Sequence, residues 1–169
     1  GELTTMTLVP QVADAVEIPV LAAGGIADGR GMAAAFMLGA RGVQCGTVFL
    51  ACEECRIHER YKQRVVAAKE IDTVVTGRRL GHPVRALKNQ LTREFNAMEY
   101  DSARTNEEIE ALGVGAVRRA AVEGDLERGS FLCGQIAGMI HEVRPAAQII
   151  REMSQQAEAL LKGAAAWVK

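Results

Sequence analysis

The chain of 169 residues is 49% apolar, which is enough to bury the core of one domain. Twenty basic and twenty-one acidic residues leave a net charge of −1, so charge gives no reason to expect nucleic acid or an anionic membrane as a partner. The apolar stretches are too short for a membrane span, and four cysteines do not indicate a disulfide framework, so we expect a reduced, cytoplasmic protein.

The first third of the chain alternates between helical and strand patterns. Apolar residues at helical spacing predict a helix over residues 3–16, in which Pro10 marks a kink or a late start. Residues 18–23 form a short apolar run of the kind that a fully buried parallel strand shows. Residues 43–49 predict a second strand, interrupted at Gly46 and Thr47.

Between these two strands the sequence predicts a helix over residues 30–38. Asp28 is a good N-cap for it, and Gly39 is placed to close it as the first residue beyond the helix. Because connections between consecutive parallel strands are short and right-handed, we expect the two strands to be neighbours in one sheet. This order of strand, loop, helix and strand is typical of a parallel α/β sheet or barrel.

Beyond residue 52 the pattern becomes mostly helical, with one β-branched strand expected over residues 73–76. Helices are expected over residues 58–69, 85–98, 107–122 and 145–168, the last with Pro145 near its first turn. The glycines of residues 131–140 predict a loop that approaches a ligand or another part of the backbone. Residues 100–106 are the best candidate for a mobile loop.

Two glycine-containing loops at the strand ends carry the strongest functional signal. The first is Ala-Ala-Gly-Gly-Ile-Ala-Asp-Gly at residues 22–29, and the second is Gly-Val-Gln-Cys-Gly-Thr at residues 42–47. Neighbouring βα loops of a barrel open on one face, where loops after the last strands commonly build a phosphate site. Glycine lets backbone amides approach phosphate oxygens closely, and the Thr47 hydroxyl adds a donor. Either loop alone would more often be a simple chain reversal, but the pair predicts a phosphate-bearing ligand.

Several longer segments resemble the nitronate monooxygenase/enoyl-reductase II superfamily of flavoproteins. The similarity to its FMN-phosphate segment lies in residues 21–29 (LAAGGIADG), 36–40 (FMLGA) and 43–47 (VQCGT). The enoyl-acyl-carrier-protein reductase II branch in particular is similar at residues 72–77 (DTVVTG), 80–85 (LGHPVR), 122–130 (VEGDLERGS) and 134–138 (GQIAG). The likeness extends from about residue 1 to residue 151.

This resemblance implies an α/β fold that is the C-terminal part of an FMN-binding (β/α)8 TIM barrel with additional C-terminal helices. Residues 1–52 would supply strands and helices of the barrel, and residues 53–169 a mostly helical region packed on it. Residues 134–138 would lie near the flavin. The implied FMN-binding residues are Gly24, Gly25, Gln44, Cys45, Gly46 and Thr47.

The activity implied by the resemblance is that of an FMN-dependent enoyl-acyl-carrier-protein reductase of fatty acid biosynthesis. NADH or NADPH would be the co-substrate, an enoyl thioester on an acyl carrier protein the substrate and partner, and the protein a homodimer. A nitronate monooxygenase, with the same FMN site but oxygen and an alkyl nitronate as substrates, is the first alternative. The second is a non-catalytic fragment of such an enzyme.

The resemblance assigns no catalytic residue within the chain. In the family the catalytic His lies in a Gly-Gly-His-x-Gly element whose last glycine resembles Gly1, so we expect that His to precede the chain. A complete barrel needs about 250 residues, which also favours a piece of a longer polypeptide. His82 could act near the flavin or nicotinamide, although a structural role is expected. No metal is expected, because the Cys52-x-x-Cys55 pair lacks the further ligands of a zinc site.

Overall fold

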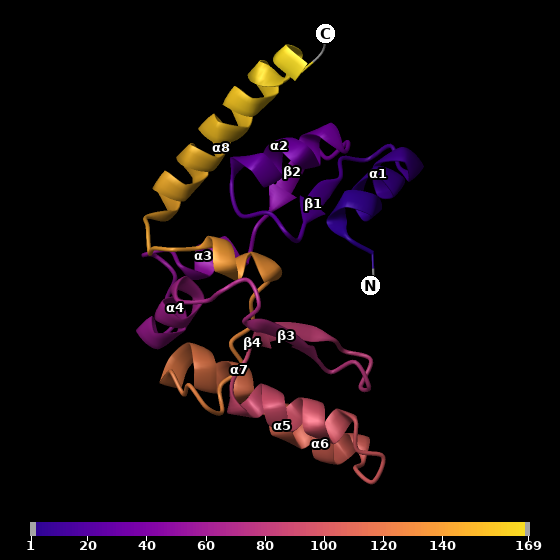
Figure 1. Cartoon of the computed structure of the whole chain (residues 1–169), viewed down its shortest axis with the longest axis vertical. Helices are drawn as coiled ribbons and strands as arrows, with labels where there is room; N and C mark the ends of the chain where they lie inside the picture. The colour runs from indigo at the N-terminus through magenta and orange to yellow at the C-terminus, as the bar shows by residue number, and fades with distance from the viewer. Residues whose placement is uncertain (1–2, 168–169) are drawn as a thin grey trace.

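A computed structural model of the chain describes residues 3–167, and these contain the strand-helix-strand unit expected near the N-terminus (Figure 1). Strand β1 (Leu21–Ala23) pairs in parallel with strand β2 (Gly42–Gln44), and helix α2 (Gly29–Met37) connects them. The two strands are in register, with Ala22 opposite Val43. The prediction that they are adjacent and parallel is therefore confirmed.

Helix α1 (Thr5–Ala15) precedes this unit and contains Pro10 in its interior. The expectation of a late start at Pro10 is wrong, because the Thr4 carbonyl already accepts hydrogen bonds from the amides of Thr7 and Leu8. A proline removes a single helical hydrogen bond at its own position, and α1 continues through it.

Strand β1 is shorter than predicted and only its central residue is buried. Ala22 is fully buried, whereas Leu21 and Ile18 are 62% and 72% exposed. Side chains alternate between the two faces of a strand, and within residues 3–167 only one face of β1 is covered. The expectation of a fully buried strand over residues 18–23 is therefore wrong for the part of the chain that the structure describes.

Both ends of α2 follow the sequence prediction. The Asp28 carboxylate accepts hydrogen bonds from the amides of Arg30 and Gly31 and so caps the helix. At the other end, Gly39 has a φ of 98°, and its amide donates to the Phe36 carbonyl. A left-handed glycine in this position ends the helix because other residues adopt this conformation only with strain.

The second predicted strand ends sooner than expected. Strand β2 stops at Gln44, and Thr47–Leu50 form the short helix α3 instead of continuing as a strand. The Phe49 amide donates to the Gly46 carbonyl, which turns the chain at the predicted interruption. This turn buries Thr47 and Val48, whose β-branched side chains had favoured a strand.

After helix α4 (Glu59–Val66) the chain forms an antiparallel hairpin of strands β3 (Thr73–Thr76) and β4 (Val84–Leu87). The predicted strand at residues 73–76 is confirmed, but the helix predicted from residue 85 is wrong at its start. Helix α5 (Gln90–Glu99) begins only after Asn89, whose side chain forms a capping box with Thr92.

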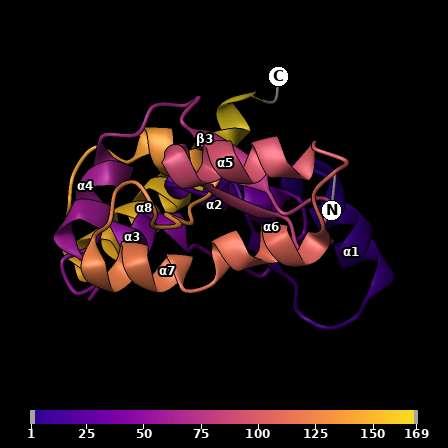
Figure 2. The same cartoon turned by 90° about the horizontal axis from the view of Figure 1, so that it is seen from below.

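The helix predicted over residues 107–122 is broken in the middle. Helix α6 (Asn106–Gly113) ends before Gly115, which has a φ of 72°, and the short helix α7 (Ala116–Arg118) and the π-helical turn η1 (Arg119–Glu123) follow. Figures 1 and 2 show α6 lying along α5 beside the hairpin.

The larger core connects α4, β4 and the segment that follows Ser130. Phe131 is fully buried, and its ring meets that of Tyr61 edge to face, with the centroids 4.8 Å apart. The Tyr61 hydroxyl donates to the Leu132 carbonyl across 2.7 Å, and the 3-10 turn η2 (Gln135–Met139) follows. A side chain at Gly138 would lie 2.6 Å from the Glu70 amide nitrogen, so this glycine does approach another part of the backbone as predicted.

The last long helix, α8 (Ala146–Gly163), runs back along α2 and is followed by the 3-10 turn η3 (Ala164–Trp167) (Figure 1). The Gly29 amide donates to the Gln156 side chain across 2.8 Å at this contact. Within residues 3–167, no helix has the length and apolarity needed to cross a membrane. Gly1, where the family histidine element would end, and Val168, the predicted end of the last helix, lie outside the described residues. The division of the chain at residue 52 stays a prediction.

Candidate functional site

The two glycine loops leave the carboxyl ends of β1 and β2 at the same edge of the sheet. Ala23 is opposite Gln44, so Gly24 and Cys45 begin the loops from neighbouring positions. This is the arrangement that the sequence predicted from adjacent parallel strands, and it is the edge at which α/β proteins commonly bind ligands.

The first loop turns through two consecutive glycines in the left-handed region. Gly24 has a φ of 102° and Gly25 a φ of 75°, which other residues adopt only with strain. The Thr5 hydroxyl donates to the Gly24 carbonyl across 2.8 Å and so ties the loop to the start of α1. A side chain at Gly25 would meet no protein atom within 4 Å, so its backbone faces open space.

The second loop reaches its turn without unusual backbone angles. Gly46 has a φ of −99° and a ψ of −63°, which any residue can adopt, and a side chain there would also meet nothing within 4 Å. The protein itself therefore gives no steric reason for glycine at position 46. A ligand that approaches the backbone closely would supply one.

Three amides of the predicted phosphate site have no hydrogen-bond partner among the residues that the structure describes. Within residues 3–167, no backbone or side-chain acceptor takes the amide hydrogens of Gly25, Gly46 and Thr47. Such amides at the ends of parallel strands are suitable donors to an oxyanion. That all three reach one anion stays a prediction.

Thr47 connects the second loop to a distant segment of the chain. Its buried hydroxyl accepts a hydrogen bond of 2.7 Å from the Gly134 amide. The segment at residues 134–138, which the family resemblance placed near the flavin, therefore begins directly against a predicted FMN-binding residue.

Gln44 and Cys45 differ in what they offer a ligand. The Gln44 side chain is exposed and makes no hydrogen bond within residues 3–167, so its amide is available as donor and acceptor. Cys45 is half-buried, and burial raises the pKa of its thiol. A neutral thiol is a weak nucleophile, which agrees with a backbone role for Cys45.

An open cleft of about 850 Å³ adjoins the first loop. This volume lies within the range of about 300–1,000 Å³ that is typical of small-molecule sites. Its walls are residues 3–6 of the first helix region, residues 24–26, three residues of α2 and its C-cap Leu38, Arg78 and Arg85 of the hairpin, and Gly134 and Gln135. Of the predicted site residues, Gly24 and Gly25 line the cleft and residues 44–47 do not.

Arg78 and Arg85 are lining residues that the sequence did not reveal. Arg85 closes the family-like segment at residues 80–85, and Arg78 follows Gly77 at a strand end, but nothing in the pattern distinguished them from other surface arginines. His82 does not line the cleft. It lies in the hairpin turn, where its main-chain amide donates to the Gly77 carbonyl.

A second cavity and a pair of cysteines lie outside this site. A smaller cavity of about 170 Å³ lies between α4 and the start of the hairpin, away from both glycine loops. Cys52 and Cys55 are free thiols, and no group of metal ligands occurs in the part of the chain that the structure describes.

Comparisons with known proteins agree on a family. A family model described as nitronate monooxygenase matches residues 1–156. A probable nitronate monooxygenase from Staphylococcus saprophyticus is 39% identical over 155 residues, which are 91% of this chain and 43% of that protein. The chain therefore spans less than half the length of this curated relative.

Two solved structures are also similar to this chain. FabK from Thermotoga maritima is 49% identical and superposes with a TM-score of 0.94 over 99% of this chain and 53% of FabK. Nitroalkane oxidase from Streptomyces ansochromogenes is 28% identical, with a TM-score of 0.79 over 95% of this chain and 45% of the oxidase. These matches confirm the predicted α/β fold as part of a (β/α)8 barrel with additional helices.

Proposed function

The chain belongs to the nitronate monooxygenase family, and from this premise we propose that it forms the FMN-phosphate region of an enoyl-acyl-carrier-protein reductase. The observation that supports this choice is the similarity to FabK, an enoyl-acyl-carrier-protein reductase II. That similarity covers 99% of the chain at 49% identity, against 39% for the curated nitronate monooxygenase.

The donor set fits the phosphate of FMN. Within residues 3–167 the amides of Gly25, Gly46 and Thr47 have no protein acceptor, and an added Cβ at either glycine would meet nothing within 4 Å. In the proposed site these amides hold the phosphate, Gly24 shapes the turn, and the Gln44 side chain reaches a polar edge of the cofactor. Cys45 contributes its backbone, and burial, which raises the pKa of its thiol, further disfavours the reactive thiolate.

When bound, FMN supplies the transfer of two electrons from NADH or NADPH to the enoyl thioester. The residues of this chain then act as a remote anchor, because the phosphate lies far from the reacting ring. Binding energy gained at such an anchor fixes the position of the ring against its substrates, and positioning is a large part of catalysis. Docking of an acyl carrier protein and formation of a homodimer belong to the same proposal.

The decisive experiment compares two reactions in an FMN-loaded polypeptide that contains this chain and is extended to the length of FabK. We expect oxidation of NADH or NADPH in the presence of a crotonyl thioester, with stoichiometric FMN after purification. Consumption of oxygen with an alkyl nitronate, in the absence of a thioester reaction, would instead identify a nitronate monooxygenase. This second function is favoured by the match of the nitronate monooxygenase family model to residues 1–156.

A further inference from the structure

We propose that Arg78 and Arg85 form a second anion subsite, which binds a phosphate of a substrate in the same cleft that adjoins the glycine loop. The proposal rests on the proposed function, which assigns the flavin phosphate to the glycine loops and supplies the two candidate ligands. It adds the chemistry of the hairpin residues that line the same cleft.

The charge of the cleft is the first argument. Arg78 and Arg85 are the only charged side chains among the lining residues that the structure describes. Neither has a carboxylate within 4.0 Å in residues 3–167, although eight ion pairs occur there among other residues. Two guanidinium groups without a counter-ion make this wall of the cleft electropositive, and a cleft focuses such a field.

Arg85 is held in place from the hairpin. It lies opposite Val75 in the β3–β4 pair, and its Nη1 donates to the Thr73 hydroxyl across 2.9 Å. This single contact occupies one of five N–H groups and leaves the rest of the fork to a ligand. Arg85 is also half-buried, so its charge is less screened by water than that of a surface arginine.

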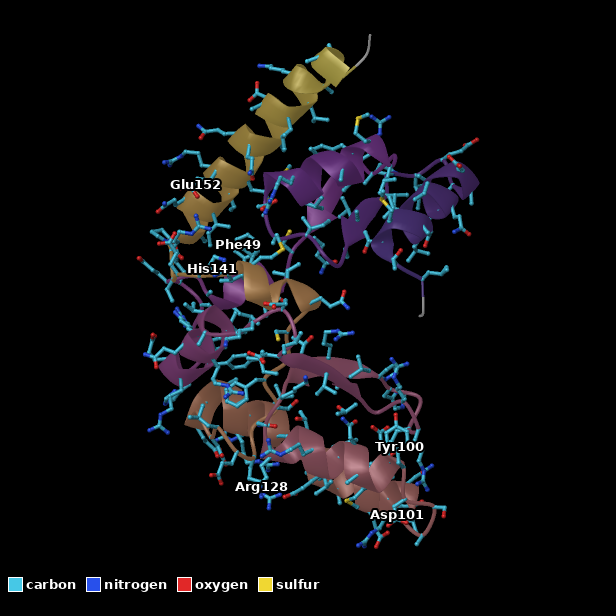
Figure 3. All side chains as sticks on the ribbon, in the orientation of Figure 1. Phe49, Tyr100, Asp101, Arg128, His141 and Glu152 are labelled. Atoms are coloured by element: carbon cyan, nitrogen blue, oxygen red, sulfur yellow. The ribbon has the colours of Figure 1, made fainter. Side chains whose placement is uncertain are left out.

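Arg78 is positioned through its neighbours. The amides of Gly77 and Arg79 both donate to the Glu99 carboxylate, across 2.9 and 3.0 Å, and so anchor the backbone on either side of Arg78. The side chain of Arg79 extends to the turn after α5, where it donates to the carbonyl of Asp101, which Figure 3 marks beside Tyr100. The two adjacent arginines therefore differ in role. Arg79 ties the hairpin to the turn after α5, and Arg78 lines the cleft.

The ligand class follows from the guanidinium group. Arginine binds phosphate through two parallel hydrogen bonds, which a carboxamide or hydroxyl cannot match. Two sources of such a phosphate meet an enzyme of this kind: the diphosphate of a nicotinamide dinucleotide, and the phosphate of a phosphopantetheine arm that carries the thioester. The shared chemistry is a phosphate ester that approaches from the hairpin side.

The test uses the FMN-loaded polypeptide extended to the length of FabK and its double variant Arg78→Met/Arg85→Met. Arg60→Met serves as the matched control, because Arg60 is exposed on α4 and does not line the cleft. The substrates are crotonyl-phosphopantetheine and crotonyl-pantetheine, which differ only by the phosphate, each with NADH. We expect the double variant to raise one KM about tenfold or more, as loss of charge-assisted hydrogen bonds predicts.

The pattern of the change identifies the source. A higher KM for crotonyl-phosphopantetheine but not for crotonyl-pantetheine assigns the subsite to the carrier arm. A higher KM for NADH with both thioesters unaffected assigns it to the dinucleotide. Equal effects of the double variant and Arg60→Met, or unchanged KM values throughout, would overturn the proposal.

Direct binding separates this proposal from the proposed function. Calorimetry with 4′-phosphopantetheine, pantetheine and ADP-ribose requires no turnover, so it remains informative if the protein reduces no enoyl thioester. We expect one of the two phosphate compounds to bind the unmodified protein and to lose about tenfold or more in affinity in the double variant. Absence of binding by both compounds would refute the subsite even in an active reductase.

Discussion

Thr47 and Gly134 are 87 positions apart in the sequence, and the Thr47 hydroxyl accepts a hydrogen bond of 2.7 Å from the Gly134 amide. The contact joins the loop after β2, which does not line the cleft, to the segment at Gly134 and Gln135, which does. It therefore fixes two parts of the candidate site relative to each other.

Replacement of Thr47 by Val should destabilise the protein. The substitution keeps the shape of the side chain but leaves the partly buried Gly134 amide without an acceptor, which costs about 1–3 kcal/mol. Thr47→Ser keeps the hydroxyl and should lose only about 0.8 kcal/mol for the missing methyl group. Urea unfolding of the three proteins measures both effects, and equal stability of the Val and Ser variants would contradict a role for the hydrogen bond.

Gly46→Val should remove FMN without unfolding the protein. The backbone angles at Gly46 suit any residue and the space around it is open, so the fold should tolerate valine to within about 1 kcal/mol. The added side chain would occupy the approach of the phosphate. Absorbance of the purified protein near the flavin bands measures cofactor content.

Gly163→Val is the matched control for that experiment. Gly163 also has open space around it and lies at the end of α8, outside the cleft. We expect this control to keep its FMN. A yellow Gly46→Val protein with one FMN per chain would show that the phosphate lies elsewhere.

The sequence predicted the two glycine loops but not the cleft beside the first of them. Two glycine loops after apolar runs predicted parallel neighbours, because backbone pairing and loop length leave few alternatives. The same pattern could not place the cleft, since part of its lining comes from residues 78, 85 and 134–135, far along the chain. Arg78 and Arg85 reach it through the β3–β4 hairpin, and the sequence of β4 had been interpreted as the start of a helix.

That misinterpretation has a local cause. Residues 85–98 carry apolar residues at helical spacing, but Asn89 and Thr92 form a capping box that starts α5 only at Gln90. Leu87 and Ala86 are instead buried as strand residues against Phe131, whose carbonyl accepts from the Leu87 amide. Periodicity alone does not record such a tertiary contact.

Gly29→Ala should loosen the contact between α2 and α8. A methyl group at Gly29 would lie 2.5 Å from both the Ala157 amide nitrogen and the Met153 carbonyl oxygen. Backbone atoms cannot yield as side chains do, so the cost should be about 1–3 kcal/mol. Gly163→Ala, at the open end of α8, should be neutral or stabilising in the same unfolding assay. Equal effects of the two substitutions would argue against close packing of the helices.

Acid should remove part of the stability that Asp28 contributes to α2. Burial raises the pKa of Asp28, but hydrogen bonds from the Arg30 side chain and from the amides of Arg30 and Gly31 outweigh it, so the folded pKa lies below its usual value. A lowered folded pKa means that the contribution is complete above the unfolded pKa of about 3.9 and is lost as the pH falls through the folded pKa.

Asp28→Asn provides the comparison, because asparagine caps helices as well but does not titrate. Urea unfolding at about pH 7 and about pH 3 should show a smaller wild-type advantage at the lower pH. A difference between the two proteins that stays constant over this range would mean that the charge of Asp28 contributes nothing.

The 169-residue chain by itself should show no turnover. Leu21 and Ile18 of the β1 region and Met6 of α1 are 62%, 72% and 67% exposed. Apolar side chains and strand edges of this kind favour self-association. The amides of the glycine loops anchor only the phosphate of FMN in the proposed site, and an anchored phosphate leaves the distant ring free to move unless other residues hold it.

The chain matches 53% of FabK, so a polypeptide extended to the length of FabK is the natural comparison. Both proteins receive FMN, NADH and a crotonyl thioester, and light scattering records their association. Turnover by the 169-residue chain equal to that of the extended protein would place the catalytic groups within residues 1–169, and His82→Ala would then be the first variant to assay.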